Sequence, residues 1–262
     1  MKLIVFCLIL VPCLAIPSEI QTDKATVELP DGAISCQIDS PTRDECIKEA
    51  IQDMIPNLQK GMDYLNIPPI DPYTVNGTTF EYKRGDIAAT LNVKTVTFHG
   101  MSKAQIKDVR TKIDELGMST EIDVFMPRIY AEGLYKATGK VNSFKINAKG
   151  TFNMTFKDTA ITQKMKGVFE TVDGERYLRI ESYDIIPTIG DLKVQMTGIF
   201  PDPELNKLAV EFINQYWPFL YRDIIPETRK MWEPMLLEQI NAFMLRLPFS
   251  KMLYYGDERK QN

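Results

Sequence analysis

The chain has 262 residues, a formal net charge of −4 and a pI near 5.3. This acidic balance argues against a nucleic-acid partner, which would need clustered Lys and Arg. Because His99 is the single histidine, multi-histidine metal sites are excluded and most proton-relay mechanisms are disfavoured. We therefore expect no metal, no cofactor and no enzymatic activity.

The first fifteen residues have the pattern of a secretory signal peptide. Lys2 precedes an apolar run over 3–11, and the segment ends at the small residue Ala15, where we expect cleavage. The run is shorter than the ~20 residues that span a bilayer, and no later stretch resembles a membrane anchor. We expect a secreted protein with a single domain over 16–262. A buried N-terminal strand is the alternative interpretation of this segment.

Cleavage would leave two cysteines, Cys36 and Cys46. Two cysteines in a secreted chain are expected to form a disulfide. The bridge would join an extended arm, 16–37, to the start of the first helix. Two free thiols are the alternative.

The first helix is predicted from Thr42 onward, where Thr42–Glu45 fits a capping box. Apolar residues then recur every three or four positions from Cys46 to Met62, which indicates an amphipathic helix. Pro68 and Pro69 exclude its continuation.

From about residue 78 to residue 200 the apolar period is two, which predicts strands. The run from Ile87 to Val93 changes phase before Val96, which suggests a β-bulge. A run from Met118 to Met126 is expected to end at Pro127. Turns are expected at 173–174 and 190–191, where Gly and Asp are adjacent.

The clearest alternation covers 146–156, where Phe152, Met154 and Phe156 share one face and Asn153 and Thr155 share the other. Such long strands favour one large, curved antiparallel sheet over a compact sandwich.

The last third of the chain is predicted to be a long helix. Asp202 can cap it and Pro203 can open it, and an apolar stripe continues to Leu247. Prolines at 218, 226 and 234 are expected to bend it. A helix this long needs an equally long surface to cover its stripe, and the curved sheet is the obvious partner. The predicted fold class is therefore α+β.

Soft and aromatic side chains are abundant on the clearest strand and on the long helix, and such residues can enclose an irregular apolar ligand. Judged by pattern alone, such apolar stripes more often form part of an ordinary hydrophobic core than line a ligand site. The candidate ligand-lining residues are Phe152, Met154, Phe156, Phe212, Tyr216, Met231, Met235 and Met244.

Two sequons for N-glycosylation occur, at Asn76 and Asn153. Asn76 lies beside Gly77 in an expected loop, whereas Asn153 lies on the polar face of the clearest strand. His99 has Ser102 three residues later, but we expect a turn histidine rather than a catalytic base.

The order of these features resembles the insect takeout and haemolymph juvenile hormone-binding protein family. The features are the signal peptide, the close cysteine pair before a helix, the segment 67–72 (Ile-Pro-Pro-Ile-Asp-Pro), the long strands, and a final helix with Asn214-Gln215-Tyr216-Trp217. The resemblance implies a long C-terminal helix wrapped by a highly curved antiparallel sheet, with an elongated hydrophobic tunnel between them. The hormone carriers have a second disulfide for which this chain lacks cysteines, so it is nearer the takeout-like branch.

The leading functional hypothesis is a secreted, monomeric carrier that binds small hydrophobic ligands, such as terpenoids, fatty acids or pheromone-like compounds. The alternative is a secreted signalling or interaction protein whose tunnel is filled or vestigial. A hydrolase is the third reading, and the lack of a nucleophile-elbow motif weighs against it. The sequence identifies neither the ligand nor a receptor.

Overall fold

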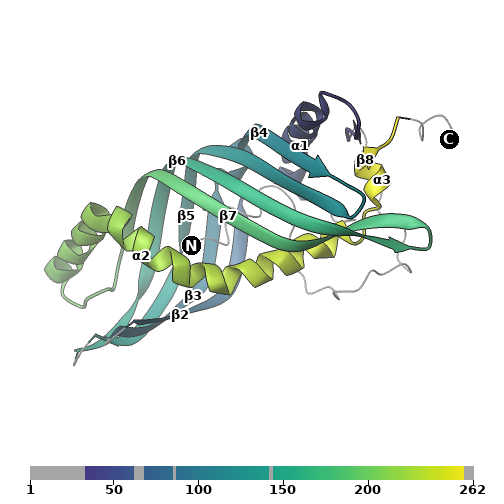
Figure 1. Cartoon of the computed structure of the whole chain (residues 1–262). Helices are drawn as coiled ribbons and strands as arrows, with labels where there is room; N and C mark the ends of the chain where they lie inside the picture. The colour runs from purple at the N-terminus through teal and green to yellow at the C-terminus, as the bar shows by residue number, and fades with distance from the viewer. Residues whose placement is uncertain (1–32, 62–67, 85–86, 142–143, 257–262) are drawn as a thin grey trace.

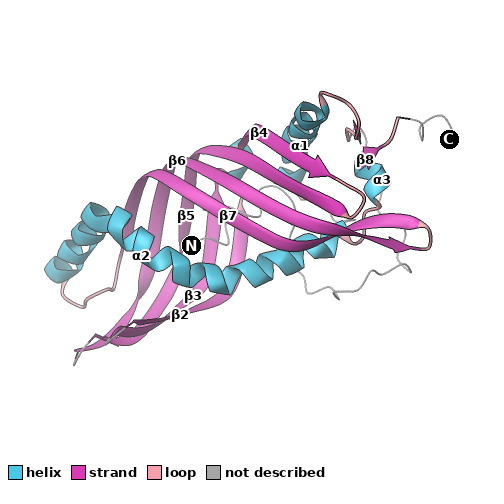
Figure 2. Cartoon of the chain, viewed as in Figure 1, coloured by secondary structure: helices cyan, strands magenta, loops and turns pink. Residues whose placement is uncertain are grey.

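The computed structural model describes residues 33–61, 68–84, 87–141 and 144–256. The expected signal peptide, 1–15, and most of the expected arm, 16–37, lie outside these ranges. The chain forms one large curved sheet with a long helix lying along it (Figures 1 and 2). In chain order the elements are β1 (Cys36–Gln37), α1 (Arg43–Lys60), β2 (Tyr73–Arg84), β3 (Ile87–His99), the short 3-10 helix η2 (Met101–Lys103), β4 (Gln105–Ile113), β5 (Gly117–Val141), β6 (Phe144–Val172), β7 (Glu175–Met196), α2 (Pro203–Met244), α3 (Phe249–Met252) and β8 (Leu253–Tyr254).

The main sheet is antiparallel, with the strand order β2-β3-β5-β6-β7. β4 also pairs with β5. β5 is long enough to pair with β4 along 118–125 and with β3 along 130–141. The sheet is strongly curved and its edges do not pair with each other, so the predicted α+β class with a highly curved sheet is confirmed.

The phase change predicted in the first alternating run is confirmed. The register between β3 and β5 shifts between Val93 and Thr95, so one extra residue of β3 is accommodated there. The first strand of the main sheet, β2, begins at Tyr73, a few residues before residue 78, where the two-residue apolar period was predicted to begin.

Two predicted strand breaks are wrong, because Pro127 lies inside β5 and Gly190 lies inside β7. Pro127, Asp158 and Gly190 form a row across β5, β6 and β7 in which none of the three takes part in the ladder. A proline is tolerated at such an irregular position because no amide hydrogen is needed there. Asp158 has a φ of 49°, and a Cβ added to Gly190 would lie 2.9 Å from the Cβ of Asp158.

This row, which we call the crease, changes which residues face inward. On β5 both Met126 and Ile129 are buried, and on β6 both Phe156 and Thr159 are buried. Strand side chains normally alternate between the faces, so residues three positions apart share a face only where the strand is irregular. The crease therefore divides the sheet into two halves with opposite inward phases.

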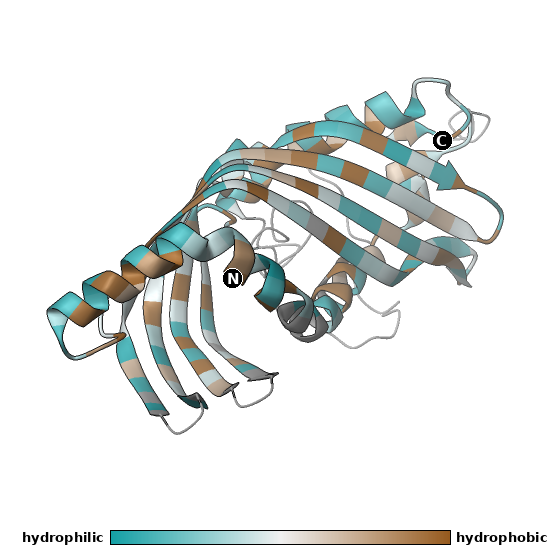
Figure 3. Ribbon diagram, turned by 60° about the vertical axis from the view of Figure 1, so that its left-hand side comes forward, coloured by the Kyte–Doolittle hydropathy of each residue, from teal (hydrophilic) through white to brown (hydrophobic). Residues whose placement is uncertain are grey.

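Helix α2 runs along the outer edge of β7. It begins as predicted, with Asp202 accepting a hydrogen bond from Leu205 N at 2.9 Å and Pro203 in the first turn. Its 42 residues make it roughly 63 Å long, and three prolines lie inside it. Figure 3 shows α2 passing beside the curved sheet, with apolar residues recurring along both.

Asparagine side chains of α2 take the place of a further strand on β7. Asn214 accepts from Val194 N at 2.7 Å and donates to Val194 O at 2.8 Å. Asn241 makes the same pair of bonds with Ile180, both at 2.7 Å. Asn206 accepts from Ile199 N and donates to Met196 O. These amides satisfy backbone groups at an edge that would otherwise be open to strand pairing.

Helix α1 closes the outer edge of β4 in a similar way. Gln52 accepts from Ile106 N at 2.8 Å and donates to Ala104 O at 3.2 Å. Asp44 accepts from Thr111 N at 3.1 Å, and Arg43 donates to Thr111 O. The predicted capping box is wrong, because the Thr42 side chain makes no cap hydrogen bond. The acidic residues of this turn point to β4 or to neighbouring cations instead.

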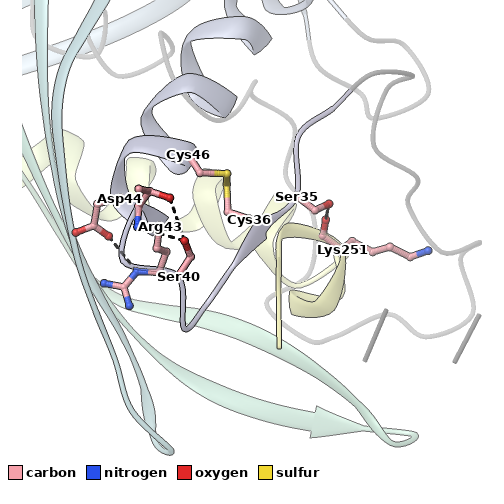
Figure 4. The surroundings of a disulfide bond; sticks show 8 residues. Ser35, Cys36, Ser40, Arg43, Asp44, Cys46 and Lys251 are labelled. Atoms are coloured by element: carbon pink, nitrogen blue, oxygen red, sulfur yellow. Dashed lines mark hydrogen bonds and ion pairs between the residues drawn. A yellow bond between two sulfur atoms is a disulfide. The ribbon is translucent and has the colours of Figure 1, made fainter. Parts of the chain in front are cut away.

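The disulfide between Cys36 and Cys46 is present, as predicted (Figure 4). It joins β1 to the first turns of α1. β1 pairs in parallel with β8, and Ser35 donates a hydrogen bond to Lys251 O at 2.7 Å. The bridge therefore ties the start of the described chain to both α1 and the C-terminal segment.

Candidate functional site

The larger apolar core fills the half of the molecule beyond the crease toward α1 and α3, and it continues past the crease to residues such as Phe156 and Val194. Residues of the C-terminal part of α2, including Leu236, Ile240 and Met244, join this core at 4% exposure or less. They pack with inward residues of the sheet such as Ile122 and Ile161. This end of the enclosure is filled by the protein's own side chains.

The other half carries a smaller apolar cluster. Its buried members are Val93, Tyr135, Ala148 and Phe152. Six partly buried residues pack against them: Phe80, Leu91, Val96, Ala137, Met154 and Met196. These residues come from β2, β3, β5, β6 and β7, so the concave face of this half is apolar across the sheet.

The N-terminal half of α2 carries an apolar stripe that the described part of the chain does not cover. Its members are 45–62% exposed and follow one another at three- or four-residue spacing: Leu205, Leu208, Phe212, Tyr216 and Phe219. At 3.6 residues per turn the stripe lies roughly opposite Asn206 and Asn214, which bind β7. Because α2 also contacts β2, the helix connects the two outer strands of the main sheet. The stripe is on the side of α2 that faces away from β7.

The predicted lining residues fall into four groups. Phe152 belongs to the open half, and Met154 packs against both clusters. Phe156 and Met244 belong to the larger core, although Phe156 lies on the same side of the crease as Phe152. Phe212 and Tyr216 lie on the exposed stripe, with ring centroids 4.7 Å apart. Met231 and Met235 are on α2, but their side chains lie outside the described part. Which of the eight contact a ligand stays a prediction.

Polar side chains that are buried as a whole are few and uncharged, and the Nε atom of the half-buried Arg246 is the charged group that also reaches the interior among the described residues. Buried polar side chains among the described residues are Thr111, Thr120, Thr159 and Gln163. Burial raises the pKa of the Tyr135 and Tyr221 hydroxyls, because the ionised form is disfavoured away from water. The hydroxyl of Tyr135 donates to Thr197 O at 2.9 Å. Sequence reasoning missed Gln163 because a lone glutamine has no local signature.

Charged side chains gather on the outward face instead. Arg110 of β4 bridges Asp108, Glu121 and Asp123, and Lys164 reaches Glu121. Hydrogen bonds from Arg110 and Lys164 lower the pKa of Glu121. These ion pairs are largely exposed, so each contributes little to stability.

The structure does not bring His99 and Ser102 together as a catalytic pair. His99 Nε2 lies 3.6 Å from Glu132, whereas Ser102 donates to Asp71 at 2.5 Å. Among the described residues, no three His, Cys, Asp or Glu side chains are grouped in a way that could hold a metal. No helix in the described ranges is long and apolar enough to cross a membrane.

We expect Asn76 rather than Asn153 to carry a glycan when the chain passes through a secretory pathway. The expected loop at Asn76 is wrong, because Asn76 lies within β2 opposite Thr95 of β3. It is nevertheless exposed on an outer strand, beside Gly77, which has a φ of 66° and open space around it. Asn153 is half-buried in mid-sheet between β5 and β7. Deglycosylation followed by mass measurement checks this: Asn76→Gln should abolish the mass shift and Asn153→Gln should preserve it. A shift that persists in Asn76→Gln would contradict the prediction.

Known proteins share this sequence pattern and this fold. The family model for haemolymph juvenile hormone binding protein matches residues 7–254. A Schistocerca gregaria protein named "Putative beta-carotene-binding protein" is 21% identical over 214 residues, covering 80% of this chain and 84% of its own length. The crystal structure of Takeout 1 from Epiphyas postvittana superimposes with a TM-score of 0.68 at 17% identity, covering 84% of this chain and 99% of that protein.

An open curved sheet whose outer strands are connected by a long C-terminal helix is the takeout fold. Because the family model covers nearly the whole sequence, the chain belongs to the haemolymph juvenile hormone binding protein family. The resemblance predicted from the sequence is therefore confirmed.

Proposed function

We propose that this protein is a secreted, monomeric carrier of small hydrophobic molecules rather than an enzyme. The observation that carries this proposal is the pairing of an apolar concave sheet with an uncovered apolar stripe on α2. Exposed apolar area of this extent is costly in water unless something covers it. An elongated apolar ligand between the stripe and the sheet would cover both.

Family membership supports ligand binding, and the name of the Schistocerca relative supports long apolar molecules as a cargo class. The disulfide and the signal-like segment support secretion. The second candidate is an interaction protein with a filled tunnel. The observation in its favour is that one half of the interior is packed with the protein's own side chains. The two candidates differ in whether the apolar stripe is used for a small molecule.

We expect Phe212→Asp to weaken binding of cis-parinaric acid, a fluorescent fatty acid, by about tenfold, which corresponds to ~1.4 kcal/mol. A carboxylate in the stripe would have to be desolvated by the ligand chain. Phe212 is 54% exposed, so the loss of folding stability should be small. Fluorescence titration of the purified protein measures the affinity.

The matched control is Lys207→Gln, which makes the same change of −1 in net charge at an exposed position of the same helix, away from the stripe. Its affinity should equal that of the wild type. Equal weakening by both variants would show a general charge effect and contradict a role of the stripe. Absence of binding of fatty acids, terpenoids and sterols by the wild type would favour the interaction protein.

A further inference from the structure

The packed half of the interior contains a polar side chain that is only half satisfied. Gln163 of β6 is 1% exposed. Its Oε1 accepts a hydrogen bond from the hydroxyl of Tyr183 at 2.7 Å. Within the described part of the chain, its Nε2 is buried and has no hydrogen-bond partner. Leaving a buried donor unpaired is unfavourable, so this amide calls for a physical explanation.

The residues around Gln163 offer it nothing to bind. Directly opposite in the register are Ile122 of β5 and Ile185 of β7. Ile161 and Met165 flank it on the same face of β6. All four are buried in the main core. The cross-strand and same-strand neighbours therefore supply no acceptor for Nε2.

The same surroundings define what could bind. Because Nε2 is a donor, the missing partner is an acceptor oxygen. None of those four neighbours is charged, so an ionised carboxylate placed there would lack a compensating cation. A neutral carbonyl, ester or ether oxygen suits the position better.

We infer that Gln163, positioned by Tyr183, is an anchor that donates a hydrogen bond to a neutral oxygen of an otherwise apolar ligand; this rests on the proposed carrier function. The ligand's hydrocarbon part extends from the anchor past the crease toward the open half. Buried side chains surround Gln163, and Met165 is the adjacent one that moves most readily to admit a ligand, since methionine is unbranched and flexible.

A second unpaired polar group, the hydroxyl of Thr159, lies between the anchor and the crease but is not part of the anchor. Thr159 is 1% exposed and its Oγ1 has no partner among the described residues. It faces inward four residues before Gln163, hence roughly 13 Å away along the strand. One oxygen cannot reach both groups.

Competition between matched ligands tests the anchor. Methyl laurate and tridecane have similar hydrocarbon lengths, but only the ester carries acceptor oxygens. Each displaces bound diphenylhexatriene from the wild type, from Gln163→Met and from Gln195→Met. Methionine keeps the side-chain length and removes the donor, and Gln195 is an exposed glutamine of β7.

We expect Gln163→Met to weaken the binding of methyl laurate by about fivefold or more, the effect of losing one hydrogen bond. The affinity for tridecane should stay unchanged. Gln195→Met should change neither. Equal effects on both competitors, or on neither, would overturn the anchor while leaving the carrier function intact. Failure of diphenylhexatriene and both competitors to bind the wild type would overturn the carrier function and the anchor with it.

A measurement on the wild type covers the case in which Gln163→Met does not fold. The side-chain amide protons of Gln163 are followed by NMR during titration. A downfield shift with methyl laurate but not with tridecane supports the hydrogen bond. Identical spectra with the two ligands would overturn it.

Discussion

Replacing Asn241 by Leu is expected to lower the free energy of unfolding by about 3 kcal/mol. Asn241 both accepts from Ile180 N and donates to Ile180 O, each at 2.7 Å. Ile180 is 2% exposed. Leucine has a similar shape but leaves one buried donor and one buried acceptor unpaired, and each costs roughly 1–3 kcal/mol.

Urea denaturation of the purified protein measures this loss. Glu238→Leu is the matched control, since Glu238 is exposed on the same part of α2, and its effect should stay within about 0.5 kcal/mol. Asn214→Leu should cost less than Asn241→Leu, because the part of α2 around Asn214 is less covered. If Asn241→Leu and Glu238→Leu were equally stable, the amide would not be sealing the edge of β7.

The sequence predicted the elements whose signal is local. Alternation over 146–156 was enough to place Phe152 and Phe156 inward, because strand side chains point to opposite faces. The phase change before Val96 was enough to predict the bulge in β3. The start of α2 followed from Asp202 and Pro203, whose roles at a helix N-terminus depend only on the next few residues.

The crease could not be predicted, because its cause lies in three strands at once. Taken singly, Pro127 indicates the end of a strand and Gly190 indicates a turn. In the sheet both lie beside Asp158. Because all three residues are left out of the hydrogen-bonded ladder at the same level, β5, β6 and β7 each continue past this point. The edge-sealing roles of Asn214 and Asn241 were hidden for the same reason: their partners are 20 and 61 residues away.

The candidate site was predictable in part. Periodicity showed that Phe212 and Tyr216 belong to an apolar stripe, but it does not show whether a stripe is covered. That depends on where the sheet ends relative to the helix. Met244 continues the same stripe and is 4% exposed, because the core near α1 and α3 surrounds it. The sequence therefore identified the apolar helix face, and the structure separated its packed part from its open part.

Replacing Phe152 by Ala is expected to destabilise the protein by about 3–4 kcal/mol, within the range for a buried aromatic ring. Phe152 is 6% exposed and pairs with Gly133 of β5. A Cβ added to Gly133 would lie 2.7 Å from Cζ of Phe152, so the ring lies directly over the glycine. Truncation would expose that glycine and remove the contact with Tyr135, whose ring centroid is 6.4 Å away.

The size of this loss also separates core from ligand-lining surface. Leu134→Ala is the control, since Leu134 is 47% exposed and should lose less than ~1 kcal/mol. A loss near 3–4 kcal/mol in urea denaturation, with cis-parinaric acid affinity unchanged, would place Phe152 in the core. A smaller loss with an affinity weakened about fivefold or more would place it on the ligand-facing wall, where the cavity tolerates truncation. A loss below about 0.5 kcal/mol with unchanged affinity would contradict both roles, because a buried ring must contribute either to packing or to the ligand.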